Sequence, residues 1–404
     1  MGRTRAKAKK SVPIVTNPSQ SSSSSATPAI HALLDKAQEL IVQCDFPLAR
    51  KFIERALVRG DGSVSEKNQA GEMMGVVLLE TGEVDKAREL FLTLLPPHPT
   101  APTPPPPSAH LYLAQLSTDP YTALKHYQAA IDILQTQLKG KAPSPTQGDE
   151  QDEGEDEVRS NIVRAYVGMV EVWMDPEYDL CFDPAASSTC DSLLANALQI
   201  DPHNLEALQC LASVRLSQEK TEEALAALLT FPPSSLDAPP ALNQALVAAL
   251  PLSVRLARAK LLLECGAYHD ALDVLENVLA SDDSSVEGWY LMGWGWWLVA
   301  ERQKEGGEVE GSEGLTWEDL ARDSRDCLET CQMVSLPRFY VSCKSRCNLH
   351  ESQSDPDTPI LEHVQELLGT LDALGIMSSP VQDDEEGDGD GWEDANDGED
   401  VEMS

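Results

Sequence analysis

Apolar residues recur with helical spacing along most of the chain. Leu33, Ala37 and Leu40 lie three or four positions apart, and the same spacing returns in the next segment after a short polar break. This spacing places apolar side chains on one face of a helix, whereas a strand would alternate them. Alanine and leucine supply most of the apolar content and aromatic residues only 5% of the chain, which also favours helices. The pattern predicts an all-α protein built from paired helices.

The predicted pairs repeat one signature. In LEALQCLASVRLSQEKTEEALAALL, Leu208 and Ala212 and then Ala224 and Leu228 match the tetratricopeptide spacing W-x2-L-G-x2-Y followed by A-x3-F, although Arg215 stands at the tyrosine place. About seven successive units fit, several of them at an offset of 34 residues. Small residues at the glycine and alanine places let two helices approach, and large ones fill the groove between pairs. The sequence therefore predicts a tetratricopeptide-repeat superhelical solenoid. Its other units are identified by Leu33, Ala37, Leu40, Phe46, Ala49, Ile53 and Ala56; Met74, Gly75, Leu78, Gly82, Ala87 and Phe91; Leu113, Ala114, Ala123, Tyr127 and Ala130; Val167, Gly168, Cys190, Leu194 and Ala197; and Ala259, Leu262, Gly266, Tyr268, Ala271 and Leu275.

One aromatic stretch, WYLMGWGWWL, holds four of the seven tryptophans. Trp289, Gly293 and Trp296 fall on signature places of a further unit, so the two tryptophans are expected in the packing between helices. Trp294 and Trp297 are surplus to the signature. The helical register directs them to the inner face of the array, where they are expected to contact a partner.

Several segments break the helical pattern. Prolines remove backbone donors and clash with the preceding turn, and runs of like charge or of serine contain too few apolar groups to fold. The predicted organisation is a disordered basic and serine-rich tail (1–28), three units (29–140) with a Pro-rich loop (96–108), an acidic loop (141–157), four units (158–335) with a loop at 302–314, C-terminal helices (336–378) and a disordered acidic tail (379–404).

The net charge of -37 restricts the partners. Nucleic acid and anionic membrane surfaces would be repelled, so neither is expected as a direct partner, and a basic protein is favoured. The alternative is that the acidity serves solubility alone. There is no apolar run of about 20 residues and no secretory signal, so we expect an intracellular protein whose nine cysteines are reduced.

The inner face of a tetratricopeptide array is where function is expected, because the first helix of each pair lines a groove that holds peptide segments. Acidic and aromatic side chains there suit the stems and charged heads of arginine and lysine. The alternative is that the tryptophans fill gaps and the acids solvate a helix face. The residues assigned to this client-binding groove are Glu72, Glu80, Glu171, Trp173, Asp175, Glu264, Glu287, Tyr290, Trp294 and Trp297.

Other chemistry is less favoured. Cys327 and Cys331 with Cys343 and Cys347 have the composition of a four-thiolate site, but their i, i+4 spacing fits buried helix positions better than zinc knuckles. We expect no enzyme, cofactor or metal, because no phosphate loop, metalloprotease helix or nucleophile elbow occurs. A cochaperone that holds the carboxylate-ended tails of heat-shock chaperones is the alternative binding function. It would need a basic groove, and Lys260 is the lone clear base.

The chain resembles the fungal assembly chaperones of the large-subunit ribosomal protein called L-four. The resemblance rests on the repeats, on the acidic C-terminal tail and on an insertion in the fourth unit, where the family carries a similar Y-M-T-D-L-C-x-E-P-D-A segment. It implies a non-enzymatic monomer that holds the basic internal loop of that protein, keeps it soluble and escorts it from cytoplasm to nucleus for pre-60S assembly. The basic residues 3–10 would then serve an import receptor. The insertion residues that match are Met174, Asp175, Asp179, Leu180, Cys181, Asp183, Pro184 and Ala185.

Overall fold

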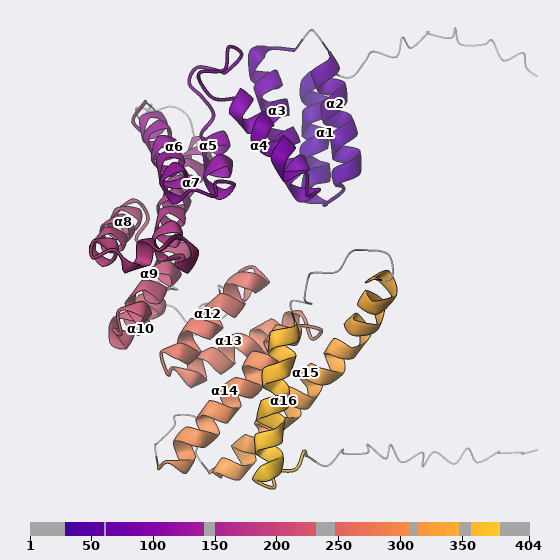
Figure 1. Cartoon of the computed structure of the whole chain (residues 1–404), viewed down its shortest axis with the longest axis vertical. Coiled ribbons are helices and arrows are strands. Elements are labelled where there is room, and N and C mark those ends of the chain that lie inside the picture. The colour runs from indigo at the N-terminus through magenta and orange to yellow at the C-terminus, as the bar shows by residue number, and fades with distance from the viewer. Residues whose placement is uncertain are drawn as a thin grey trace, which may run out of the picture. The chain divides into compact units, whose positions relative to one another are not determined.

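The computed structural model describes residues 29–59, 62–140, 150–231, 247–306, 314–346 and 357–379. All regular secondary structure in these ranges is helical, as the pattern predicted (Figure 1). No helix among the described residues is long and apolar enough to cross a membrane. The chain divides into two compact units, Met1–Val172 and Trp173–Ser404.

The first unit consists of consecutive helices that pack as antiparallel neighbours. Within it α1 packs on α2, α3 on α4 and α5 on α6, and the buried side chains of α1 to α5 form one core. The last two residues of α7 fall in the second unit. The helices are α1 (Ile30–Val42), α2 (Phe46–Val58), α3 (Val64–Glu80), α4 (Val84–Thr93), α5 (Pro107–Gln115), α6 (Pro120–Gly140) and α7 (Glu150–Met174).

The second unit repeats this arrangement. Here α9 packs on α10, α12 on α13 and α14 on α15, while α16 packs on α14 and α15. One core extends from α9 to α16. The elements are the 3-10 turns η1 (Pro176–Tyr178) and η2 (Leu180–Phe182), then α8 (Ala186–Ile200), α9 (Leu205–Ser217), α10 (Thr221–Leu229), α12 (Leu252–Glu264), α13 (Tyr268–Ser281), α14 (Val286–Lys304), α15 (Trp317–Arg346) and α16 (Thr358–Ala373).

The same turn connects the two helices in four of the described helix pairs. In each, the second residue after the first helix has a positive φ, between 59° and 78°. The N–H of the following residue donates to the carbonyl five positions earlier, at 2.8 to 3.0 Å. This is the left-handed helix end that glycine fits best. Its recurrence shows the repeat in the backbone itself, even where cysteine or glutamate replaces glycine. The four residues are Cys44, Gly82, Glu219 and Gly266.

Close helix contacts occur at the predicted small residues. A Cβ on Gly75 would lie 2.4 Å from the ring of Phe91, and one on Gly293 would lie 2.7 Å from Cγ of Leu328. Gly168 faces Tyr127 in the same way, at 2.5 Å. Glycine is therefore required at these crossings by space, because a methyl group would overlap a buried side chain.

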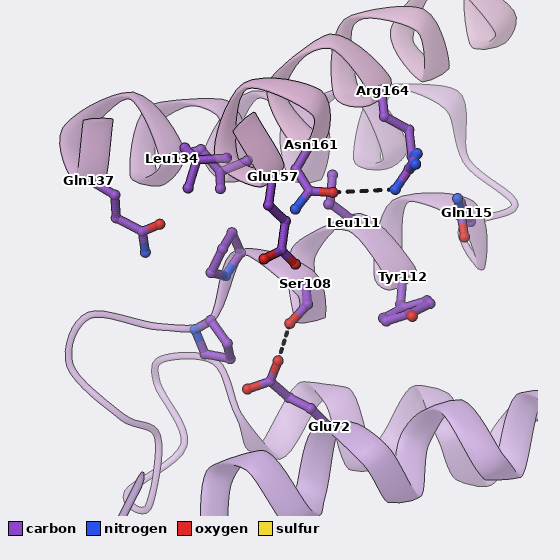
Figure 2. A pocket seen from close by; sticks show the side chains of 13 residues that line it. Glu72, Ser108, Leu111, Tyr112, Gln115, Leu134, Gln137, Glu157, Asn161 and Arg164 are labelled. Carbon is purple, nitrogen blue, oxygen red and sulfur yellow. Dashed lines mark hydrogen bonds between the residues drawn. The ribbon is translucent and has the colours of Figure 1, made fainter. Parts of the chain in front are cut away.

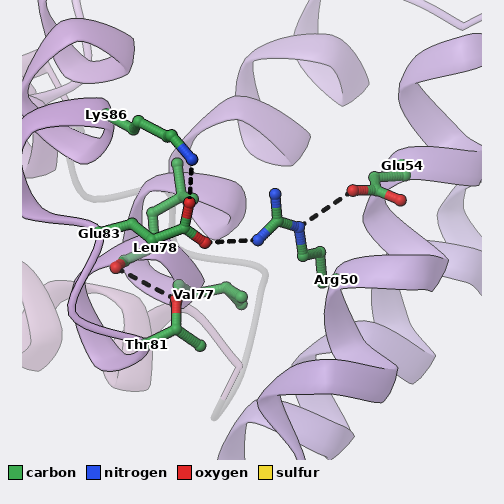
Figure 3. Close-up of polar contacts among 7 residues, drawn as sticks. All are labelled: Arg50, Glu54, Val77, Leu78, Thr81, Glu83 and Lys86. Carbon is green, nitrogen blue, oxygen red and sulfur yellow. Dashed lines mark hydrogen bonds and ion pairs between the residues drawn. The ribbon is translucent and has the colours of Figure 1, made fainter.

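Polar contacts on the surface join neighbouring pairs in the first unit. The Arg50 guanidinium on α2 donates from Nη1 to Glu83 Oε1 at 2.6 Å and from Nε to Glu54 Oε1 at 3.0 Å (Figure 3). Lys86 also pairs with Glu83. Exposed ion pairs of this kind contribute little to stability.

The structure corrects several predicted boundaries. The Pro-rich loop ends earlier than predicted, because Pro107 occupies the first turn of α5, where its missing N–H has no helical partner to lose. Residues 150–157 of the predicted acidic loop begin α7, and residues 302–304 of the second predicted loop end α14. The boundary at 335/336 is also wrong, because α15 runs across it. The predicted N-terminal tail lies outside the described residues, and so does the predicted acidic tail apart from its first residue, Ser379.

Candidate functional site

A pocket of about 530 Å³ opens in the first unit between α3, α5, α6 and α7 (Figure 2). Three of these helices are the first helices of successive repeat units, so the pocket lies on the face where the sequence predicts the groove. Its wall combines carboxylates, amides, one tyrosine and one arginine. The lining residues are Glu72, Pro106, Pro107, Ser108, Leu111, Tyr112, Gln115, Leu134, Gln137, Glu157, Val158, Asn161 and Arg164.

Glu72 is the predicted groove residue that the structure places in this pocket. Its side chain, on α3, is half-buried and accepts a hydrogen bond from the Ser108 hydroxyl at the start of α5. Burial raises the pKa of the Glu72 carboxyl, and the Ser108 hydrogen bond opposes this only in part. No basic side chain is among the causes of this pKa shift. Arg164 is the basic residue of the pocket wall, and its charge is not among the causes of the Glu72 pKa shift.

Tyr112 forms an aromatic part of the wall. Its ring stacks on the fully buried ring of Phe91, with centroids 4.9 Å apart and planes 14° apart. Burial raises the pKa of the Tyr112 hydroxyl, and the negative charges of Glu72 and Glu80 raise it further. The two acids predicted on α3 thus act on the same point of the pocket. Glu80 itself is exposed at the end of its helix.

One face of α7 supplies the polar side of the pocket. Glu157, Asn161 and Arg164 lie four and three residues apart, so they share a face of the helix. Arg164 Nη1 donates to Asn161 Oδ1 at 3.3 Å, and the arginine charge lowers the pKa of Tyr112. Sequence reasoning missed Glu157 because it assigned residues 141–157 to a loop, whereas Asn161 and Arg164 lay in a predicted unit but were not assigned to its groove. Their helical spacing was the available signal.

Ser108 and Tyr112 were also missed. Both belong to α5, a short helix that begins directly after the proline-rich segment. Their spacing of four residues puts them on one helix face, but the prolines before them obscured where the helix begins. Nothing in their residue types distinguishes them from ordinary surface positions.

The structure separates the members of the predicted aromatic patch on α14. Trp297 is only 9% exposed and belongs to the core, so its assignment to a partner surface is wrong. The reason is that α14 is contacted by α12, α13, α15 and α16, which leaves little of its circumference free. Trp289 and Trp296 pack against the same core but stay partly exposed.

Tyr290 and Trp294 are brought together on α14, with ring centroids 5.9 Å apart. Both rings contact His363 of α16, and the Tyr290 hydroxyl and His363 Nδ1 form a hydrogen bond of 2.9 Å. Glu287 forms an ion pair with Lys260. The chain's own residues therefore engage this patch.

The remaining predicted groove residues are not part of the pocket lining. Asp175 Oδ1 accepts a hydrogen bond from the Glu177 N–H at 2.9 Å and so caps η1. Glu171 is exposed, Trp173 is half-buried near the end of α7, and Glu264 is exposed at the end of α12.

The candidate thiol site has core character where it is described. Cys331 is buried, its Sγ lies 3.3 Å from the carbonyl of Val286, and burial raises its pKa to about 11. Burial, followed by the nearby aspartates, raises the pKa of Cys327 to about 12. The side chains of Cys343 and Cys347 lie outside the described part. Among the described residues, no three histidine, cysteine or acidic side chains are placed to hold a metal ion.

Comparison with known proteins identifies the family. Residues 34–102 match a family model described as tetratricopeptide repeat. A "Probable assembly chaperone of rpl4" from Schizosaccharomyces pombe is 31% identical over 334 residues, which cover 80% of this chain and 86% of that protein. A protein of the same description from Emericella nidulans is 32% identical over 54% of each chain.

A solved structure agrees with these relatives. Residues 1–338 of an assembly chaperone of RpL4 superpose with a TM-score of 0.50 at 27% identity, over 69% of this chain and 99% of that one. Both the predicted fold class and the predicted resemblance are thereby confirmed. The chain belongs to the family of tetratricopeptide-repeat proteins that contains the assembly chaperones of rpl4.

Proposed function

We propose that this protein is a dedicated, non-enzymatic chaperone of ribosomal protein L4 that binds a basic segment of its client on the acidic inner face of the repeats. The names of the relatives support the choice of client, and the net charge of -37 supports the sign of the interaction. The observation that carries the binding mode is the pocket in the first unit, where Glu72 is half-buried and, among the described residues, accepts its hydrogen bond from Ser108 rather than from a base.

The physical role follows from the client's charge. A free segment rich in arginine and lysine binds polyanions with little sequence choice, because each base it carries releases counterions from RNA. An acidic groove occupies those bases until ribosomal RNA competes for them. Binding to the chaperone should therefore weaken steeply as salt concentration rises.

The proposal extends to transport. The chain would bind its client as a monomer in the cytoplasm and enter the nucleus with it, with residues 3–10 contacting an import receptor. A fluorescent fusion that lacks residues 1–10 tests this step. Retention in the cytoplasm is expected, and unchanged nuclear accumulation would remove the basic segment from the mechanism.

The heat-shock cochaperone alternative has less support. It requires bases on the inner face that are available to an anionic peptide terminus. Lys260, the base that sequence analysis singled out, forms an ion pair with Glu287.

Co-purification tests the function directly. The full chain, tagged and isolated at low salt, is expected to retain one basic ribosomal protein, L4, at 1:1 stoichiometry and to lose it progressively as salt is added. Light scattering after size exclusion measures the stoichiometry. Recovery of heat-shock chaperones with no L4 would support the alternative, and a complex insensitive to salt would contradict the acidic groove.

A further inference from the structure

The pocket in the first unit has two carboxylates converging on one point. Glu72 approaches from α3 and Glu157 from α7, and Figure 2 shows both carboxyl groups directed toward Ser108 from opposite sides. A hydrogen bond from the Ser108 hydroxyl joins Glu72 to Ser108. Two negative groups that converge on an open volume favour a cation between them.

The fold gains little from Glu72. A half-buried carboxylate is penalised by desolvation, and here a single hydroxyl provides the compensation, so its pKa is raised. A structural role would be better served by glutamine, which carries no charge to desolvate. A ligand cation would turn the same carboxylate into a favourable partner, because charge pairs are stronger where water is partly excluded.

The rest of the wall suits a planar cation with an apolar stem. Tyr112 offers an aromatic surface, and Pro106 and Leu111 add apolar surface beside it. A guanidinium carries donors in a rigid fork, so it can bond two carboxylates at once while its stem packs on a ring. An ammonium is a more strongly hydrated point charge and uses such a wall less well.

Arg164 limits how many added cations the pocket can hold. It lines the same pocket, engages Asn161, and lies close enough to Tyr112 to lower the pKa of that hydroxyl. Its positive charge would repel a second cation from that side. The volume of about 530 Å³ also exceeds one side chain and leaves room for part of the adjoining backbone.

We infer that this pocket is a socket for a single arginine side chain of the bound client, with its guanidinium between Glu72 and Glu157 and its stem against Tyr112. The assignment of the arginine to the client rests on the proposed function. The preference for arginine over lysine rests on the pocket alone.

The first test is a double-mutant cycle with ribosomal protein L4. The chain is prepared as wild type, as Glu72→Gln and as a control, Glu89→Gln, which removes the same charge from an exposed position on α4. The arginines of L4 are changed one at a time to lysine, and affinities are measured at fixed salt. One arginine-to-lysine variant of L4 should bind the wild-type chain about tenfold more weakly, and Glu72→Gln should bind wild-type L4 about tenfold more weakly. This is the scale of one hydrogen bond to a charged group. The affinity of Glu72→Gln for that L4 variant should be no lower than the affinity measured with either change alone.

A second test does not depend on the client. N-acetyl-arginine methylamide and its lysine analogue are titrated into the full chain, and the methyl signals of Leu111 and Leu134 are followed by NMR. The arginine compound should shift these signals in wild type, the lysine compound less, and neither should do so in Glu72→Gln. Circular dichroism verifies that the variant is folded.

The outcomes separate the two proposals. If L4 does not bind wild type but the arginine compound still finds the pocket, the proposed function fails and the socket stands. If L4 binds but Glu72→Gln behaves like Glu89→Gln, or if no single arginine of L4 couples to Glu72, the socket is wrong. Absence of an arginine-specific shift at Leu111 and Leu134 also overturns it.

Discussion

Replacing Gly75 with alanine tests the packing that supports the pocket. The new Cβ would lie 2.4 Å from Cζ and 2.5 Å from Cε1 of Phe91, whereas unstrained carbon atoms stay about 3.5 Å or more apart. Phe91 is fully buried and its ring stacks on Tyr112, so it has little freedom to retreat. The substitution therefore forces either the ring or the two helices apart.

The expected magnitude comes from two opposing terms. Overpacking a well-filled site costs about 1 to 3 kcal/mol, and the enclosed ring places this site near the upper end. Alanine regains up to about 1 kcal/mol over glycine inside a helix. The net prediction is a loss of about 2 kcal/mol in the free energy of unfolding, and weaker client binding because Tyr112 moves with Phe91.

A matched control lies one turn earlier in the same helix. At Gly71 the nearest atom to a new Cβ is Cδ2 of Leu94 at 3.3 Å, the end of a flexible side chain. Gly71→Ala should therefore be neutral or slightly stabilising. Urea denaturation of the full chain, followed by circular dichroism and by amide exchange in α3 and α4, measures both variants. Equal stability of Gly75→Ala and Gly71→Ala would refute the packing argument.

Three further predictions follow from burial. Trp297→Ala should cost about 3 kcal/mol or more of unfolding free energy, as for a large core side chain, and Trp294→Ala clearly less; similar losses in thermal or urea denaturation would contradict the difference in burial. Alkylation followed by peptide mass mapping should show that Cys327, whose pKa is raised to about 12, reacts at least a hundredfold more slowly than exposed Cys44. Comparable rates for the two cysteines would be inconsistent with the described environment. The pKa of Glu72 in the folded chain lies above its ordinary value of 4.5, so the stability associated with its protonated form is present below that value and is lost as pH rises through the folded pKa. Glu72→Gln should therefore stabilise the chain relative to wild type more at pH 7 than at pH 4, and a pH-independent difference would show that the carboxylate is not desolvated.

Much of the architecture follows from the helical spacing of apolar residues and from the positions of small residues in the sequence. Helical spacing of Leu33, Ala37 and Leu40 places them in the core, and all three are buried. Gly75 and Gly293 mark close crossings in the structure as their signature places predicted. These features are readable because each depends on contacts within one helix pair or between neighbouring pairs, which recur at a fixed distance along the chain.

Boundaries and surface exposure were less predictable. An acidic composition made residues 150–157 resemble a loop, yet they begin α7 and contribute Glu157 to the pocket. Composition describes what a segment prefers alone, whereas neighbouring helices decide whether it is held in a helix. Ser108 and Tyr112 became site residues for the same reason, because α3 and α7 lie beside α5.

The aromatic stretch shows most clearly which features the sequence determined and which depended on tertiary structure. Sequence by itself determined that WYLMGWGWWL is a repeat helix and which positions carry the signature. Only tertiary structure decided that Trp297 is core, that α16 brings His363 against Tyr290 and Trp294, and that Glu72 is half-buried beside Ser108. The helical period gives the direction of a side chain from its own axis. What lies in that direction depends on helices that are distant in sequence, and the same distant contacts set the desolvation and charge at each site.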